Sequence, residues 1–469
     1  MKRPSPPAPP GPTCPRRVDP GGLALLFLFL LSLPLVTPRL YAVDSVEYFS
    51  YLHSILFDGD LDFTNEYRYF QQLNPQAGIE GVLEKRDPTT GLPLNVAPVG
   101  TALFWSPAYL LAHGGALLAR ALGAPVEADG LSRPYILAVC YASVLYAFAG
   151  LFLSYRLCRR FFPPFPSALA VALVWLATPA FFYSHASPPW SHSVSLFAVA
   201  LLVYVWHTTR EQPAPARFLL LGLLGGLAAL VREQDVVFLL IPAVEALAAG
   251  RRGGVRPLLA LSGRLALLGT GAFLAFAPQL AVYRILGGRF APNPTVAGKF
   301  TWWSPAFFPV LGDPHYGLLV WCPVLLPALA GLFLLGRRDR LLGLSLGLAF
   351  LAQVYLTGAY LTWMGPGSFG PRRFIAATVL FALGLAAFLA FLREKGWPAW
   401  LLAGLGGILV AWNLGLIANW ILHPEERTSG LLWDRLPERL FWEIPRQAFD
   451  FLRRLFLERG SLYRNPGGP

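Results

Sequence analysis

Apolar runs long enough to cross a lipid bilayer recur along most of this 469-residue chain. A helix needs about 20 apolar residues to span the hydrocarbon core. Only 14% of the residues are charged, against about 25% in typical soluble proteins. Helices satisfy their own backbone hydrogen bonds without water, so the sequence predicts an all-α polytopic membrane protein. The runs lie near residues 21–42, 134–157, 165–183, 191–208, 217–231, 235–249, 262–286, 316–336, 341–361, 374–392 and 398–421.

Clusters of basic residues at every second boundary between these runs predict the orientation of the helices. Inner loops of membrane proteins carry an excess of lysine and arginine, so these clusters are assigned to the cytoplasm. The other boundaries then lie on the outer side, together with a long first outer loop, residues 43–96, that is expected to carry interfacial helices. The basic clusters occupy residues 156–160, 210–217, 251–256, 337–340 and 393–395, and the outer segments are 43–96, 184–193, 232–235, 287–316 and 363–373.

The segment from Val96 to Leu122 breaks this alternation. It is apolar enough to span the membrane, yet a single crossing would place every later loop on the side opposite to the one that the basic clusters predict. It contains Pro98, Pro107 and His113, followed by a Gly-Gly pair. We therefore expect an outer re-entrant or interfacial element, or an imperfect hairpin. This leaves about eleven transmembrane helices, and the range is 11 to 13 when a crossing by this segment is included.

The two ends of the chain differ in composition from the apolar middle. Residues 1–20 are rich in proline and basic residues, which predicts a disordered cytoplasmic tail. Residues 21–422 form the predicted transmembrane domain; a cleaved signal peptide is the alternative reading of its first run. Residues 423–469 mix charges with apolar residues spaced by three and four, which predicts an amphipathic helix on the membrane surface.

Carboxylates gather directly after the first apolar run. Asp44 and Glu47 are three residues apart and share one face if the segment is helical. A carboxylate beside the bilayer is partly desolvated, which raises its pKa toward the range of a useful base. Asp44 is the predicted catalytic base, and Glu47, Glu66 and Arg68 are predicted substrate contacts. The alternative is that Asp44 and Glu47 only solvate the end of the helix.

Two polar motifs in the outer segments were tested as metal sites. Asp58, Asp60 and Asp62 alternate with other residues, but an EF-hand needs glycine at its sixth position and glutamate at its twelfth, where Phe63 and Tyr69 stand. A calcium loop is rejected, and a loosely bound divalent cation stays open. His185 and His192 lack adjacent carboxylate or thiolate partners. No metal or cofactor is predicted, and the two histidines are substrate contacts or helix caps.

Cations on the outer side are unexpected, because lysine and arginine usually gather on the cytoplasmic side of a membrane protein. A function such as anion binding would explain them. Arg372 and Arg373 end a segment rich in glycine and proline, residues 363–374. Irregular backbone at membrane depth is tolerated where it lines a cavity, and guanidinium groups bind phosphate bidentately. Lys299 lies beside aromatic residues that could stack on a sugar. The charged residues 232–235 are interpreted as a hairpin tip in preference to a site.

The order of these features resembles the GT-C superfamily of membrane glycosyltransferases. More narrowly, the chain resembles bacterial relatives of the protein O-mannosyltransferases and of the lipid A aminoarabinose transferase. Asp44 matches the acidic residue of that family's first outer loop. Residues 95–100 (Asn-Val-Ala-Pro-Val-Gly) are similar to the segment that closes this loop, although the lysine often found there is absent. The resemblance spans most of residues 20–420.

This resemblance implies an inverting glycosyltransferase. Members take a sugar from a polyprenyl-phosphate carrier and pass it to a glycan, lipid or protein acceptor on the outer face. For this chain it implies an integral protein of a bacterial inner (plasma) membrane, with its site on the outer or periplasmic side. The formal charge of +12 reflects inner-face arginines rather than nucleic acid binding. A transporter or lipid flippase is the alternative; it would favour ionisable residues in mid-span.

Overall fold

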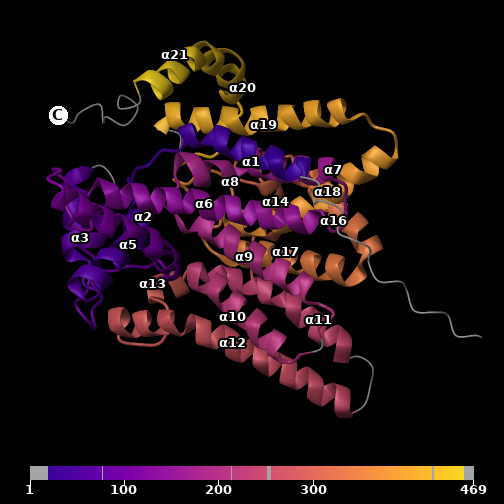
Figure 1. The fold of residues 1–469 in the computed structure, drawn as a ribbon, viewed down its shortest axis with the longest axis horizontal. Coiled ribbons are helices and arrows are strands. Elements are labelled where there is room, and N and C mark those ends of the chain that lie inside the picture. The colour runs from indigo at the N-terminus through magenta and orange to yellow at the C-terminus, as the bar shows by residue number, and fades with distance from the viewer. Residues whose placement is uncertain (1–18, 76–77, 213, 251–254, 425–426, 459–469) are drawn as a thin grey trace, which may run out of the picture.

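The computed structural model is a bundle of helices and has no strand in the part of the chain that it describes, residues 19–75, 78–212, 214–250, 255–424 and 427–458 (Figure 1). The predicted all-α polytopic membrane fold is confirmed. The described helices are α1 (Pro20–Ser32), α2 (Val43–His53), α3 (Thr64–Leu73), α4 (Glu80–Leu83), α5 (Gly100–Ala121), α6 (Arg133–Cys158), α7 (Pro164–Leu176), α8 (Pro179–Phe181), α9 (Ser191–Thr208), α10 (Ala216–Val231), α11 (Leu240–Gly250), α12 (Val255–Gly287), α13 (Pro294–Ala297), α14 (Phe307–Gly312), α15 (Leu318–Trp321), α16 (Leu325–Arg338), α17 (Arg340–Ala359), α18 (Thr378–Glu394), α19 (Ala399–Leu422), α20 (Leu436–Glu438) and α21 (Ile444–Leu457).

Shorter helical turns connect several of these helices and matter for the site. The described turns are 3-10 helices at Leu33–Leu35 (η1), Glu233–Leu239 (η5) and Arg372–Ala377 (η6), and π-helical turns at Ser54–Asp58 (η2), Phe182–Ala186 (η4) and Arg439–Glu443 (η8).

Fewer helices of the described residues have the length and hydropathy of a full membrane span than the eleven spans predicted. Among the described residues, 7 helices are long and apolar enough, or up to 8 if the pair Pro164–Leu176 and Pro179–Ala186, bent by 70°, is one span. Several predicted runs fold as shorter helices, because charged or proline-containing segments divide them. The start of the run near 235–249 folds as the 3-10 turn η5 before α11, and Pro323 separates α15 from α16 in the run near 316–336.

Small residues let the central helices approach closely. A Cβ atom added at Gly331 of α16 would lie 1.8 Å from the carbonyl oxygen of Gly384 in α18. Close backbone approach of this kind is how membrane helices gain packing contacts, since lipid provides no hydrophobic drive between them. The segment Arg372–Glu394, which contains α18, is 83% buried within its apolar window, so α18 is the central helix of the bundle. We expect that Gly384→Leu would prevent α16 and α18 from packing.

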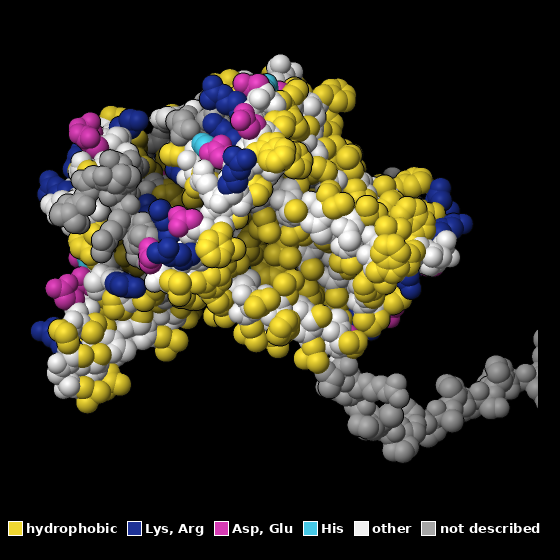
Figure 2. Space-filling view, turned by 90° about the horizontal axis from the view of Figure 1, so that it is seen from above, with side chains coloured by type: hydrophobic (Ala, Val, Ile, Leu, Met, Phe, Trp, Pro, Cys, Tyr) yellow, Lys and Arg dark blue, Asp and Glu magenta, His cyan; other side chains and the backbone are white. Residues whose placement is uncertain are grey.

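The apolar surface of the bundle fits a membrane environment. Figure 2 shows hydrophobic side chains over the middle of one face, with charged side chains gathered toward its two ends. Exposed apolar side chains on α1 and α19 include Phe27, Trp400 and Ile408. An exposed apolar belt between charged rims is what a lipid-facing surface requires.

The segment predicted to be re-entrant contains one continuous helix, α5, so the hairpin interpretation is wrong. Its 22 residues and hydropathy would permit a crossing. It packs antiparallel to the first half of α6, where Trp105 donates to Ser143 (2.8 Å). The second half of α6 lies beside α1 and ends where Arg159 contacts Asp19 (3.4 Å). The start of α1 and the first part of α5 therefore lie beside opposite ends of α6.

The two terminal segments lie outside the apolar bundle in the sequence prediction. The predicted tail, residues 1–20, lies outside the described residues except for Asp19 and Pro20; Pro20 is the first residue of α1. In the carboxy-terminal segment, α21 forms beside α19 (Figure 1). Its side chains Phe449, Leu452 and Phe456 are exposed. An amphipathic helix is thus present, and its attachment to the membrane surface stays a prediction.

Candidate active site

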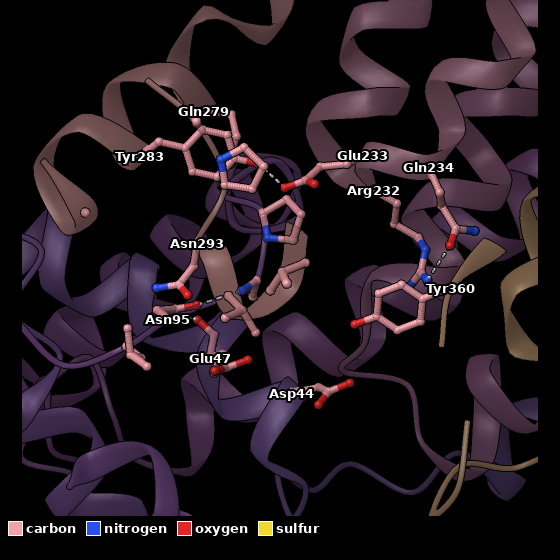
Figure 3. A pocket seen from close by; sticks show the side chains of 18 of the residues that line it. Asp44, Glu47, Asn95, Arg232, Glu233, Gln234, Gln279, Tyr283, Asn293 and Tyr360 are labelled. Carbon is pink, nitrogen blue, oxygen red and sulfur yellow. Dashed lines mark hydrogen bonds between the residues drawn. The ribbon is translucent and has the colours of Figure 1, made fainter. Parts of the chain in front are cut away.

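A cavity of about 470 Å³ opens between the start of α2, the segment 93–98, the end of α12 and the turns η5 and η6. Figure 3 shows polar side chains of α2, the segment 93–98, α12 and η5 around this space. Residues far apart in the sequence thus share one space. Its charged and polar lining residues are Asp44, Glu47, Tyr48, Asn95, Arg232, Glu233, Gln234, Gln279, Tyr283, Arg289, Asn293, Thr357, Tyr360, Arg372 and Arg373.

Asp44 lies in the first turn of α2, and its carboxylate forms an ion pair in the cavity. The Arg372 guanidinium donates to Asp44 Oδ2 at 3.1 Å. The same guanidinium lies 4.6 Å from the centre of the Trp190 ring, which supports it by a cation–π contact. The Asp44 side chain is 46% exposed. The structure therefore gives the predicted base an open carboxylate and an arginine partner.

Glu47 lies one helical turn further on and is the buried carboxylate of the pair. The residue is 4% exposed, and the Asn95 side chain donates to its backbone oxygen at 3.0 Å. Burial raises the pKa of Glu47 to about 8; the nearby charge of Asp44 adds to the rise, and a hydrogen bond from the Val96 backbone opposes it. The desolvation that was expected at Asp44 is thus found at Glu47.

The raised pKa of Glu47 predicts a pH dependence of stability. Between the ordinary value of 4.5 and the raised value of about 8, the folded protein keeps a proton that the unfolded chain releases. Stabilisation by neutral Glu47 is therefore present at low pH and is lost as pH rises toward about 8. We expect the Tm of wild type to fall more than that of Glu47→Gln between about pH 6 and about pH 9. Equal falls in the two proteins would show that Glu47 does not titrate in this range.

Arg373 and Arg232 complete a cluster of guanidinium groups around the cavity. Arg373 lies 4.3 Å from the centre of the Tyr360 ring, and Arg232 donates to Ser191 Oγ at 2.8 Å. The Gln234 side chain donates to the Arg373 backbone oxygen at 2.9 Å, which joins η5 to η6. These contacts hold the arginines in place while their charge faces the cavity. Such a cluster can bind a phosphate.

The interpretation of residues 232–235 as a charged hairpin tip is wrong. Arg232, Glu233 and Gln234 line the cavity, and Asp235 is fully buried and accepts a hydrogen bond from Ser195. In the sequence, the feature that indicated a site role for these residues was a run of four polar residues between two apolar helices. The sequence could not show whether the turn faces solvent or folds inward.

The end of α12 supplies site residues that the sequence analysis did not identify. Gln279 Oε1 accepts from the backbone nitrogen of Val99 at 2.9 Å, which ties α12 to the start of α5. The Tyr283 hydroxyl donates to the Glu233 carboxylate. Gln279 and Tyr283 could have been predicted as site residues from their position near the end of an apolar run. Polar residues in such positions usually face a cavity or a bundle interior.

Two predicted substrate contacts in the first outer loop lie outside the cavity lining. Glu66 is fully buried, and its Oε1 lies 2.8 Å from His53 Nδ1. Arg68 is exposed on the outer surface of α3. Helix α3 turns one of these side chains inward and the other outward, and neither reaches the residues around Asp44.

The two predicted histidines and Lys299 also lie outside the lining. His185 hydrogen-bonds to Ser32 (2.9 Å) and Ser184 (2.8 Å). His192 is buried and packs against the ring of Tyr183 at 4.4 Å. Both histidines contact neighbouring helical segments in the described structure, and the interpretation as helix caps finds no side-chain cap hydrogen bond there. Lys299 does not line the cavity, although its neighbour Phe300 does.

Comparison with known proteins gives a likeness of fold. No protein-family model and no curated protein sequence matches this chain. Two solved structures are similar, both of ArnT from Cupriavidus metallidurans at 15% sequence identity. The structure bound to undecaprenyl phosphate covers 95% of this chain and 72% of ArnT with a TM-score of 0.50, and the apo structure covers 94% and 72% with a TM-score of 0.51. The predicted resemblance to the lipid A aminoarabinose transferase is thereby confirmed in the fold, and this chain is an integral membrane protein with the fold of ArnT.

Proposed function

We propose that this protein is an inverting glycosyltransferase that moves a sugar from a polyprenyl-phosphate carrier to an acceptor. The observation that carries the proposal is the cavity in which Asp44 and Glu47 face Arg232, Arg372 and Arg373. The fold of the protein is that of ArnT, and the ArnT structure was solved with undecaprenyl phosphate bound. The acceptor is a glycan, a lipid or a protein.

The arginines would bind the carrier phosphate. As the bond between the sugar C1 atom and the phosphate oxygen breaks, the phosphate gains negative charge. Guanidinium groups fixed in a cavity stabilise such charge without having to reorganise. Arg372 and Arg373 are held by aromatic rings and Arg232 by Ser191, so their positions are set before the donor binds.

Asp44 would accept the proton of the attacking acceptor hydroxyl. The acceptor oxygen bonds to C1 on the face opposite the phosphate, which inverts the configuration, and its proton passes to the Asp44 carboxylate. Neutral Glu47, with its pKa of about 8, could donate a hydrogen bond that orients the sugar or the acceptor. Open Asp44 and buried Glu47 thereby have different roles on one helix face, because their environments differ.

The proposed location is a bacterial inner membrane, with the site on the outer or periplasmic side. Arginines gather at the ends of α6, α9 and α16 that lie away from the cavity. Two of them form ion pairs there, Arg210 with Asp339 (2.5 Å) and Arg338 with Glu394 (2.7 Å). The positive-inside rule assigns that end to the cytoplasm, and the cavity then faces outward.

This orientation predicts the labelling of engineered cysteines. In a background without the native cysteines, Gln72→Cys and Pro366→Cys should both react with a membrane-impermeant thiol reagent in intact cells, because both positions are exposed and assigned to the outer side. Glu211→Cys, exposed and assigned to the cytoplasm, should react after permeabilisation only. Labelling of Glu211→Cys in intact cells, or of only one outer position, would contradict the proposed sidedness.

The activity itself can be tested with membranes that contain the protein. They would be supplied with radiolabelled polyprenyl-phosphate sugars, and the labelled product identified. Transfer of label from the carrier to an acceptor, absent from membranes without the protein, is the expected result. Movement of the carrier lipid across proteoliposomes without transfer would instead support the transporter or flippase alternative.

A further inference from the structure

A second cluster of chemically active side chains lies in the first outer loop, outside the cavity. His53 ends α2, Asp58 ends the π-helical turn η2, and Glu66 lies in the first turn of α3. His53 Nδ1 lies 2.8 Å from Glu66 Oε1 and 3.1 Å from Asp58 Oδ2. One potential ligand atom from each residue lies within 4.8 Å of the others. The cluster therefore has a nitrogen and two carboxylate oxygens around one point.

The local sequence builds this cluster through an unusual helix end. The π-helical turn closes i→i+5 hydrogen bonds, which brings Asp58 back toward His53, five residues earlier. Gly59 then adopts a left-handed conformation, with φ of 73°, and reverses the chain so that α3 can present Glu66. π-helical turns are frequent at functional sites. Nothing in the proposed transfer reaction requires this one.

The orientation of the His53 ring leaves Nδ1 facing the two carboxylates. A Cβ atom added at Gly130 would meet His53 Cδ2 at 2.7 Å. The Nε2 edge of the ring therefore faces the loop 129–130, which leaves Nδ1 for the carboxylates.

Glu66 supplies an independent indication of a ligand. Its side chain is fully buried, and Oε2 has no hydrogen-bond partner within the described chain. A buried carboxylate with an unpaired oxygen is costly unless a cation satisfies it. Asp58 is 30% exposed, so an ion could reach the cluster from solvent. The Asn65 side chain donates to Asp58 Oδ2 at 2.9 Å and orients it.

We propose that His53, Asp58 and Glu66 bind a divalent transition-metal ion of the Zn²⁺ type. In a tetrahedral zinc site with ligands at about 2.0–2.1 Å, ligand atoms are about 3.3 Å apart, so the separations of 2.8 and 3.1 Å from His53 Nδ1 would open by about half an ångström or less to admit the ion. An imidazole nitrogen favours zinc and its neighbours over Ca²⁺ and Mg²⁺. Water would fill the fourth position. The neighbouring Asp60 and Asp62 do not belong to this group of ligand atoms; their carboxylates accept from Ser54 and Thr64.

The ion would fasten the outer loop to the site helix. His53 follows Glu47 by six residues of α2, a distance of about 9 Å along a helix. The ion would therefore lie too far from the cavity to take part in sugar transfer. By joining α2, η2 and α3 it would stabilise the end of the helix that carries Asp44 and Glu47.

Metal binding to the purified, detergent-solubilised protein tests this proposal. After removal of bound metal with a chelator, ZnCl₂ should bind with one tight equivalent per chain and raise the Tm, whereas CaCl₂ should do neither. Asp58→Asn should weaken Zn²⁺ affinity at least about tenfold, and His53→Gln likewise. Asp62→Asn changes a carboxylate of the same turn that is not a ligand, so it should bind Zn²⁺ as wild type does.

The outcomes separate a metal site from an ion cluster of side chains alone. If wild type binds no Zn²⁺ tightly, and chelator leaves its Tm unchanged, the three residues only pair with one another and the proposal is overturned. Equal Zn²⁺ affinities of wild type, Asp58→Asn and His53→Gln would place the bound ion elsewhere and also overturn it. Should a variant fail to fold, the stoichiometry and chelator response of wild type still decide.

Discussion

Asp44→Asn should lower turnover by about 10²–10⁴-fold, the usual range for loss of a general base. Asparagine keeps the shape of the side chain and can still accept a hydrogen bond from Arg372, which lies 3.1 Å from Asp44 in wild type. It cannot take up the proton of an acceptor hydroxyl. The variant should therefore fold, insert and bind donor while sugar transfer is lost. Single-turnover transfer from a labelled donor would measure the chemical step directly.

Glu84→Gln is a matched control, since Glu84 is an exposed carboxylate of the same outer loop and does not line the cavity. It should transfer at the wild-type rate. Wild-type transfer by Asp44→Asn at equal expression would refute the assignment of Asp44 and make Glu47 the next candidate. A rise of activity through about pH 8 in that case would match the raised pKa of Glu47.

Arg372→Ala should weaken donor binding by about tenfold to a hundredfold, because a hydrogen bond to a charged group contributes about 1.5–3 kcal/mol. Arg373→Ala should have a similar effect. Lysine at either position should restore only part of the affinity, since it lacks the planar fork that binds two phosphate oxygens. Equilibrium binding of a polyprenyl phosphate should be measured rather than turnover, because removal of Arg372 also leaves Asp44 without its partner.

Arg68→Ala provides the comparison for these variants, because it removes an exposed arginine of the outer loop that lies outside the cavity. Its affinity for polyprenyl phosphate should equal that of wild type. Unchanged affinity in both Arg372→Ala and Arg373→Ala would remove these residues from the proposed phosphate site. Equal losses in all three variants would indicate a general effect of surface charge.

Local features of the sequence predicted the class of fold and part of the cavity. Apolar runs of this length indicate helices, because a helix satisfies all of its backbone hydrogen bonds within one segment and so leaves no polar group unpaired in lipid. Asp44 could be found because it directly follows the first run, and Arg372 and Arg373 because they stand outside against the charge bias. The sequence did not predict that η5 folds into the same cavity, since the direction of a short polar turn depends on the helices packed around it.

The sequence by itself therefore determined that this chain is a helical membrane protein with charged residues at particular helix ends, because hydropathy and spacing act along the chain. Only the tertiary structure decided which of those ends meet. The approach of α2, α12, η5 and η6 joins residues up to 328 positions apart, as in the pair of Asp44 and Arg372, and depends on contacts between helices. The same packing buries Glu47 but leaves Asp44 open. Burial and charge at a site are properties of that packing, and they set how each carboxylate can react.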